Sequence, residues 1–274
     1  MKQTPTLPQL LGRLTKEGGK LEAQAIRAIL RAFKATDPDV ALLLRELTAA
    51  LMLPNPAQRF AQRERLLRLA SATLPDLPPP FLAALTDAVT LGGNVGAGML
   101  AASGAPAALT IAAPAVEAAV AAIPARLTAI WGDARADHAA RVGRVMTQAL
   151  SAGGRYPVRA QLQATLGVSR ARAQLLATNE TLAALAAGQA AVYDRAEAEL
   201  DLTIMLTWRT AQDNRVRNGR RGGANHRMLN GKTVKRGESF VSGLTLRHPH
   251  DSAAPPNWTI RCRCVTLAKA VLDE

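Results

Sequence analysis

Apolar residues recur at intervals of three and four along the first third of the chain, which is the spacing of a helix with one buried face. This pattern predicts two packed helices between Lys20 and Leu53, with a break at Asp37-Pro38, because proline disfavours helical backbone in the residue before it. A third helix is predicted over Pro56–Ala72, with Phe60 among its inward residues. Its end is expected at the proline-rich segment that follows, within residues 73–80.

Helical spacing continues to Asp201, with one irregular stretch. The glycine-rich segment Gly92–Gly104 is expected either to interrupt regular structure or to pack unusually close to a neighbour. Ser169 is a plausible N-cap for a long final helix. The predicted helices of this part are Phe81–Val89, a long helix opened by Pro114 or Pro124 that ends near Leu150, Val158–Leu166, and Ser169 to Asp201.

Beyond Leu206 the pattern changes to short runs of alternating polarity separated by turns. The runs that predict strands are Leu206–Gln212, Thr233-Val234, Phe240-Val241, Leu244–Arg247 and Thr259–Leu267. Asn230-Gly231 predicts a type I′ hairpin turn. The predicted fold is therefore a mainly α region over residues 1–201, with a break at 73–80 and a Gly/Ala-rich stretch at 88–116, followed by a small basic α+β module over residues 202–274.

Composition adds that helices must pack through small side chains, because aromatic residues are only 3% of a chain that is 48% hydrophobic. That hydrophobic share excludes a wholly disordered chain. The net charge is +13, and the module holds 13 basic and 5 acidic residues. Most of the basic residues are arginine, which suits bidentate contacts with phosphate or carboxylate. An acidic partner is expected.

Two further classes are disfavoured by the sequence. The charge-free stretch from Ala88 to Val116 is long enough to cross a bilayer, but it consists mostly of small residues and contains Pro106 and Pro114, so no stable membrane span is expected. The chain has only two cysteines, Cys262 and Cys264, which excludes a disulfide framework. The N-terminus lacks the apolar run of a secretory signal.

Several motifs of the module occur together in one order. The chain reads Trp208-Arg-Thr-Ala-Gln-Asp213-Asn-Arg215-Val-Arg217, then His226 shortly before Asn230-Gly231, then Arg247-His-Pro-His-Asp251, and finally Cys262-Arg-Cys264. This string resembles the phage Mu F-like head-morphogenesis family, whose members show W-x-T-x-x-D-x-R-V-R, a His before an NG or DG turn, a loop with Pro and Asp, and C-R-C. The helix Arg172–Glu180 resembles the family's R-A-x-x-I-A-x-T-E helix. The resemblance covers about Ser169 to Val265, with a glycine-rich basic insertion between Arg217 and His226.

The resemblance implies a structural minor head protein of a tailed phage rather than an enzyme. Such a protein is expected inside the capsid or at the portal vertex of the virion, and in the host cytoplasm during assembly. Its expected partners are phage portal and capsid proteins and packaged double-stranded DNA, and its expected task is to assist head assembly and DNA packaging or delivery. Trp208, Asp213, Arg215, Arg217 and Gly231 are expected to hold the module together.

The cysteine pair is a candidate metal site. Alternation along an extended segment puts both thiols on one face and both neighbouring guanidiniums on the other. Zinc is the expected ion, and the candidate ligands are His226, Cys262, Cys264, His248 and His250, with Asp213 also considered. The alternative is that the thiols are small buried side chains of the core.

Two other functions stay open at this point. A metal-dependent nuclease would use Asp213 or Asp251 with His226, His248 and His250 as acid, base or metal ligands. A sequence-independent DNA-binding protein would use the basic cluster of the module. The residues expected to contact DNA or an acidic protein are Arg220, Arg221, Arg227, Lys232, Lys235 and Arg236.

Overall fold

A computed structural model describes residues 5–153, 156–220 and 223–272 of the chain. It divides into two compact units, which are described separately. The sheet unit comprises Met1–Ala25, Leu82–Ile123 and Ala177–Glu274. The helical unit comprises Ile26–Phe81 and Pro124–Leu176.

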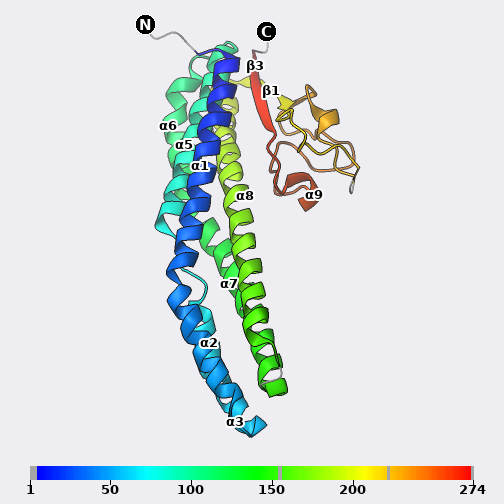
Figure 1. The fold of residues 1–274 in the computed structure, drawn as a ribbon. Coiled ribbons are helices and arrows are strands. Elements are labelled where there is room, and N and C mark those ends of the chain that lie inside the picture. The colour runs from blue at the N-terminus through cyan, green and yellow to red at the C-terminus, as the bar shows by residue number, and fades with distance from the viewer. Residues whose placement is uncertain (1–4, 154–155, 221–222, 273–274) are drawn as a thin grey trace. The chain divides into compact units, whose positions relative to one another are not determined.

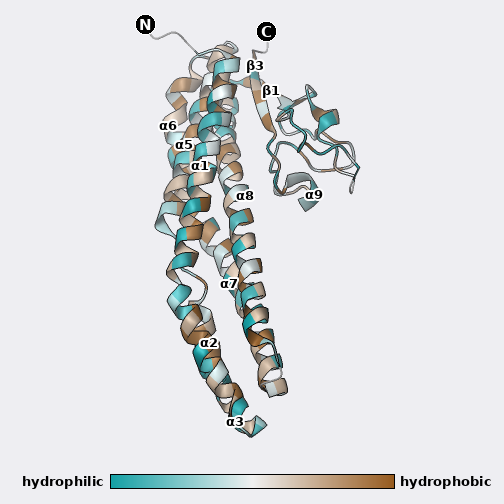
Figure 2. Cartoon of the chain, in the orientation of Figure 1, coloured by the Kyte–Doolittle hydropathy of each residue, from teal (hydrophilic) through white to brown (hydrophobic). Residues whose placement is uncertain are grey.

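The described part of the chain up to Leu200 is mainly helical, as its hydrophobic spacing predicts (Figure 1). Polar and apolar residues alternate along α1 in the manner of an amphipathic helix (Figure 2). The break predicted at Asp37-Pro38 is confirmed, since Thr36 separates α1 from α2. The helices are α1 (Leu7–Ala35), α2 (Asp37–Leu51), α3 (Pro56–Ala61), α4 (Arg63–Ala72), α5 (Pro79–Ala102), α6 (Ala108–Ala121), α7 (Ile123–Ala152) and α8 (Val158–Leu200).

Of the two prolines predicted to open the long helix, Pro124 is confirmed, since α7 begins at Ile123, whereas Pro114 lies inside α6. Two other details were wrongly predicted. Ser169 lies within α8, where its hydroxyl donates to the Thr165 carbonyl of the preceding turn instead of capping an N-terminus. Phe60, expected to face inward, is 39% exposed.

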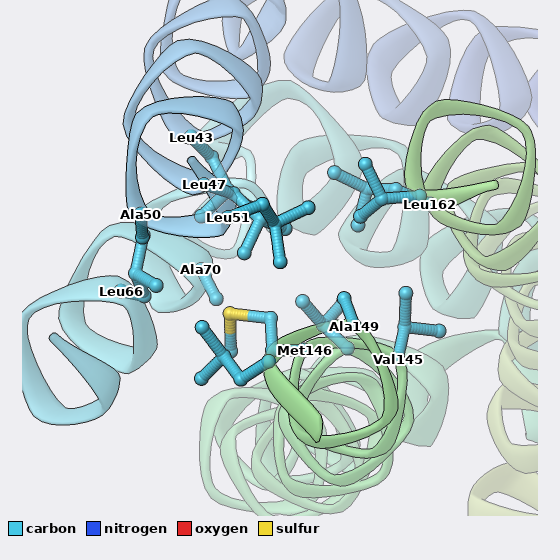
Figure 3. Close-up of a cluster of buried hydrophobic side chains, with 13 residues drawn as sticks. Leu43, Leu47, Ala50, Leu51, Leu66, Ala70, Val145, Met146, Ala149 and Leu162 are labelled. Carbon is cyan, nitrogen blue, oxygen red and sulfur yellow. The ribbon is translucent and has the colours of Figure 1, made fainter. Parts of the chain in front are cut away.

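The core of the helical unit is built from leucine, valine, methionine and alanine of four helices. Leu43 and Leu47 of α2 meet Leu66 of α4 and Met146 of α7 in one buried cluster (Figure 3). Leu162 of α8 also belongs to it. Leu43, Leu47 and Leu162 are fully buried, and each such side chain contributes about 2 kcal/mol of transfer free energy.

Most of the glycine-rich stretch is helical. α5 runs through it as far as Ala102 and ends before Gly104, and the predicted close packing against a neighbour is confirmed. A Cβ atom on Gly92 would lie 2.0 Å from the Leu185 carbonyl oxygen, and one on Gly188 would lie 2.0 Å from the Val89 carbonyl oxygen. The backbones of α5 and α8 therefore touch at a place where only glycine fits.

The sheet has three antiparallel strands in the order β2-β1-β3: β1 (Leu202–Arg209), β2 (Thr233–Lys235) and β3 (Val265–Leu272). β1 is the central strand and buries every second residue, ending with Trp208. Trp208 pairs with Thr266 of β3, at the start of that strand. The sheet therefore brings the end of β1 beside the segment that carries the cysteines.

Outside the sheet, the module is held by turns, a short helix η2 (Arg227–Leu229) and a one-turn helix α9 (Pro256–Thr259). The strands predicted over Phe240-Val241 and Leu244–Arg247 are not formed, although the Phe240 N–H donates to the Leu246 carbonyl. The strand predicted from Thr259 begins only at Val265. Thr259, the first residue of the predicted strand, is instead the last residue of α9.

The turn at Asn230-Gly231 forms, but its type was wrongly predicted. Asn230 has φ −59° and ψ 119°, while Gly231 has φ +84°. These are type II angles, in which only the second central residue has positive φ. The turn is closed by the Lys232 N–H and the Leu229 carbonyl, and Gly231 donates to the Trp208 carbonyl. It therefore fastens this loop to the end of β1.

Within the described residues, one helical stretch, Ala108–Ala152, is long and apolar enough to cross a membrane by length and composition alone. A third of its most apolar part is buried in the protein.

Candidate metal centre and the motif residues around it

Three potential metal ligands meet at the end of β1. His226 lies just before η2, and Cys262 and Cys264 lie between α9 and β3. Among the described residues, one group of three or more potential ligands converges closely, with one ligand atom each from His226, Cys262 and Cys264 within 4.8 Å of one another. All three side chains are buried, and both cysteines are free thiols.

A single nitrogen of the His226 ring faces both sulfurs. The Nδ1 atom lies 3.5 Å from Cys262 Sγ and 3.5 Å from Cys264 Sγ. The other ring nitrogen, Nε2, is buried without a hydrogen-bond partner in the described part of the chain. The polar contacts of this imidazole are thus concentrated at Nδ1.

The two thiols are electrostatically unequal. The pKa of Cys264 is lowered to about 5, because its sulfur accepts a hydrogen bond from the Cys262 thiol and is approached by His226 and the Trp208 indole. The pKa of Cys262 is raised, because its proton is held in the hydrogen bond to Cys264 and its sulfur is buried. The site therefore favours a thiolate at neutral pH, and the thiolate is the form that binds metals.

Aromatic rings enclose the cluster. Trp258 of α9 stacks on the His226 ring with centroids 5.5 Å apart, and Trp208 meets His226 edge-on at 5.6 Å. Phe240 packs against Trp208 at 5.0 Å. Trp208 and Phe240 are completely buried. These ring contacts hold the imidazole in a fixed orientation beside the thiols.

Other motif residues fasten the cysteine segment from outside. Asp213 forms an ion pair with Arg263, the residue that separates the two cysteines in the sequence. The Arg217 guanidinium donates to the Ile260 carbonyl, and the Arg261 N–H donates to Asn179 Oδ1 of α8 at 2.9 Å. The motif residues thus converge on one short segment, 260–264.

Asp213 and Arg215 lie in a loop beyond the end of β1. Residues 210–218 form a loop, in which Asp213 Oδ1 accepts from the Arg215 N–H at 3.0 Å. The Arg215 side chain lies 3.8 Å from the carboxylate and is mostly exposed. The hydrogen bond from Arg263 lowers the pKa of Asp213. The carboxylate thus keeps its structural role but takes Arg263 as its main partner.

The insertion before His226 is closed at its base. The Gly219 N–H donates to the Ala224 carbonyl, and the Arg227 N–H donates to the Arg217 carbonyl. These bonds join the two ends of the insertion, so that the chain after it continues beside Arg217. His226 therefore lies beside the cysteines despite the extra residues.

His248, His250 and Asp251 are not members of this three-ligand group. The Asp251 carboxylate is paired with Arg247 and accepts from the Ala253 N–H, and these hydrogen bonds hold its pKa below the ordinary value although burial opposes them. His250 bonds to the Cys262 backbone, and burial lowers its pKa to about 4. His248 Nδ1 lies 2.8 Å from the Pro249 carbonyl. Both histidines line a cavity of about 440 Å³ that Cys264 also borders.

The predicted basic contact residues differ in their surroundings. Arg236 is ion-paired with Asp194 and Glu197 of α8, and Lys232 donates to the Phe240 carbonyl at 2.6 Å. The side chains of Arg220, Arg227 and Lys235 are exposed. Arg221 lies outside the described residues.

Sequence reasoning had not assigned Asn179, Trp258 and Arg263 to this site. Asn179 lies in the motif helix, but nothing in its spacing showed that it reaches the Arg261 amide 82 residues away. Trp258 precedes the cysteines by a few residues, and that proximity was an available signal.

A comparison with the sequence models of protein families gives a match over part of the chain. Residues 140–267 match the sequence model of the family described as Phage Mu protein F like protein. No curated protein and no solved structure matches the chain. The matched region contains the second half of α7, α8, β1 and the cysteine segment. Over these residues, which make up slightly less than half of the chain, the protein is similar to the Phage Mu protein F like family.

Proposed function

We propose that this chain is a structural minor head protein of a tailed phage that acts at or near the portal, inside the capsid, and assists head assembly and DNA packaging or delivery. The family match over residues 140–267 carries the proposal. The convergence of the family-motif residues on segment 260–264 supports it, because the side chains that the motif shares are used here to hold the module together.

The proposed mode of action is binding without catalysis. The two carboxylates that a nuclease would need are engaged: Asp251 with Arg247 and backbone amides, and Asp213 with Arg263. A carboxylate held by a guanidinium is a poor metal ligand or general base, since the pair must first be broken.

The proposed partners are the portal and capsid proteins and the packaged double-stranded DNA. The basic contact surface is defined here as Arg220, Arg227 and Lys235, which are exposed members of the predicted set; Lys232 is left out because its ammonium group donates to the Phe240 carbonyl. Exposed cations of this kind bind phosphate or an acidic protein surface without reading base sequence. The helices before residue 140, which lie outside the family match, would supply further assembly contacts.

Genetic complementation tests this proposal. A phage whose copy of this gene is disrupted is supplied with the protein in trans. Infectious titre is measured by plaque assay, and DNA-filled heads are counted by electron microscopy. We expect a loss of at least about tenfold in filled, infectious heads without the protein, and full recovery with the wild type. The double variant Arg227→Glu/Lys235→Glu should restore poorly, because it reverses two charges of the contact surface.

The matched control is Arg144→Glu/Arg159→Glu, which reverses two exposed charges of the helical unit and should restore normally. A disrupted phage that yields normal numbers of filled, infectious heads would overturn the proposal. Metal-dependent DNA cleavage by the purified protein, lost in His226→Ala, would favour the nuclease instead.

A further inference from the structure

The geometry points to a metal site: we infer that His226 Nδ1, Cys262 Sγ and Cys264 Sγ bind one zinc ion that holds the cysteine segment to the end of β1. This inference does not depend on the head-assembly role. It rests on the distances, the burial and the chemistry of the three side chains.

The distances are those that a bound ion requires. A tetrahedral zinc with sulfur at about 2.3 Å and nitrogen at about 2.1 Å separates these two ligand atoms by about 3.6 Å. Both observed Nδ1-to-Sγ distances are 3.5 Å. Two sulfurs at equal distance from one nitrogen are therefore arranged as ligands around a common centre.

Hydrogen bonding alone explains this arrangement less well. An imidazole nitrogen carries either one proton or one lone pair in the ring plane, so it forms one good hydrogen bond. Here two sulfurs approach the same Nδ1 atom, and Nε2 has no partner in the described part of the chain. A metal on the Nδ1 lone pair accounts for both approaches at once and leaves the proton on Nε2.

The donor set selects the ion. Thiolate and imidazole together suit zinc, whereas hard ions such as Mg²⁺ and Ca²⁺ prefer oxygen. Two thiolates neutralise the charge of the ion, which allows the site to be buried. Cys264 also borders the cavity of about 440 Å³, from which a water molecule can supply the fourth ligand.

The site lies where a crosslink would matter. Cys262 and Cys264 precede β3, and His226 follows the glycine-rich insertion, 36 residues from Cys262. A zinc ion would close this long loop by joining the two segments. The module has little other regular structure there, since the described part of residues 210–264 contains only the short elements β2, η2 and α9.

Metal analysis and cobalt substitution of the full-length protein test the inference. The protein is purified in reductant without added metal, its zinc content is measured, and the chelator-treated protein is titrated with Zn²⁺ and with Co²⁺. We expect one zinc per chain, a zinc Kd below about 1 µM, and a thiolate-to-cobalt charge-transfer band in the near ultraviolet. Cys262→Ser and Cys264→Ser should each weaken zinc binding at least about tenfold.

The matched control is His248→Ala, which removes a histidine of the same module that lies outside the three-ligand group and should leave zinc binding unchanged. Circular dichroism verifies that each variant keeps its helices. If the wild-type protein, reduced and folded, binds neither zinc nor cobalt, or if the cysteine variants bind zinc as tightly as the wild type, the inference is wrong.

Discussion

His138 shows how a single buried side chain ties stability to pH. Its ring joins two hydroxyls, with Nε2 2.9 Å from Thr73 Oγ1 and Nδ1 2.8 Å from Ser169 Oγ, inside the helical unit. Burial, reinforced by Arg141, lowers the pKa of His138 to about 4 from 6.5. The folded protein therefore holds this imidazole neutral at a pH where the unfolded chain protonates it.

The sign of the effect follows directly. Above pH 6.5 both states are neutral and stability is unaffected, and between pH 6.5 and 4 the unfolded chain binds the extra proton, so stability falls. We expect His138 to contribute a loss on the order of 2 kcal/mol between pH 7 and pH 5, measured by urea unfolding, in addition to that of the buried His250. His138→Gln, which keeps a neutral donor and acceptor, should show a smaller loss over this range. An equal loss in both proteins would contradict the assignment.

The residue scale also shows which site features were readable from sequence. Alternation placed Cys262 and Cys264 on one side and Arg261 and Arg263 on the other, and both thiols do meet His226. The predicted strand is absent there, and Arg261 lies in a turn with φ +55°, yet Cys262 and Cys264 are buried while Arg261 and Arg263 are not. The ion pair of Asp213 with Arg263 could not be predicted from the sequence, because folding brings Arg263 in from 50 residues away.

At the scale of elements, the contact between α5 and α8 depends on glycine. Gly188→Ala would place a Cβ atom 2.0 Å from a backbone carbonyl oxygen, and backbone cannot move aside as a flexible side chain can. We expect a destabilisation of at least about 3 kcal/mol, measured by chemical unfolding.

Gly167→Ala is the control on the same helix, because nothing lies within 4 Å of its Cβ position. Alanine there should stabilise the protein by about 0.5–1 kcal/mol through its higher helix propensity. If the two substitutions shift the unfolding midpoint equally, the claim that the backbones of α5 and α8 touch at Gly188 is wrong.

The contact between α5 and α8 also explains why the length of α5 was not predicted from the sequence. Hydrophobic spacing located most helices, but glycine lowers helix propensity and so concealed that α5 continues through Gly92. Tertiary packing, which a single sequence does not display, overrides that preference. The short strands after Arg209 were overpredicted for a related reason, since alternating side chains suit any extended segment that packs on one side.

At the scale of the whole molecule, the family match and the division into units follow different boundaries. The match begins at residue 140, within α7, and so includes parts of both compact units. Sequence motifs predicted the sheet-bearing module and its family, because those motifs are the residues that converge on segment 260–264. The first 139 residues carry no such motif, so only their helical character was predictable.

The central claim is that this chain is a component of the phage head, and the composition of purified heads tests it most directly. Filled heads are purified from a lysate, and peptides of this chain are quantified by mass spectrometry against those of the major capsid and portal proteins. The account predicts that the chain is retained in the particles, at a constant ratio to the portal protein and in fewer copies than the major capsid protein. Its absence from heads, with the protein found instead free in the lysate, would contradict the account.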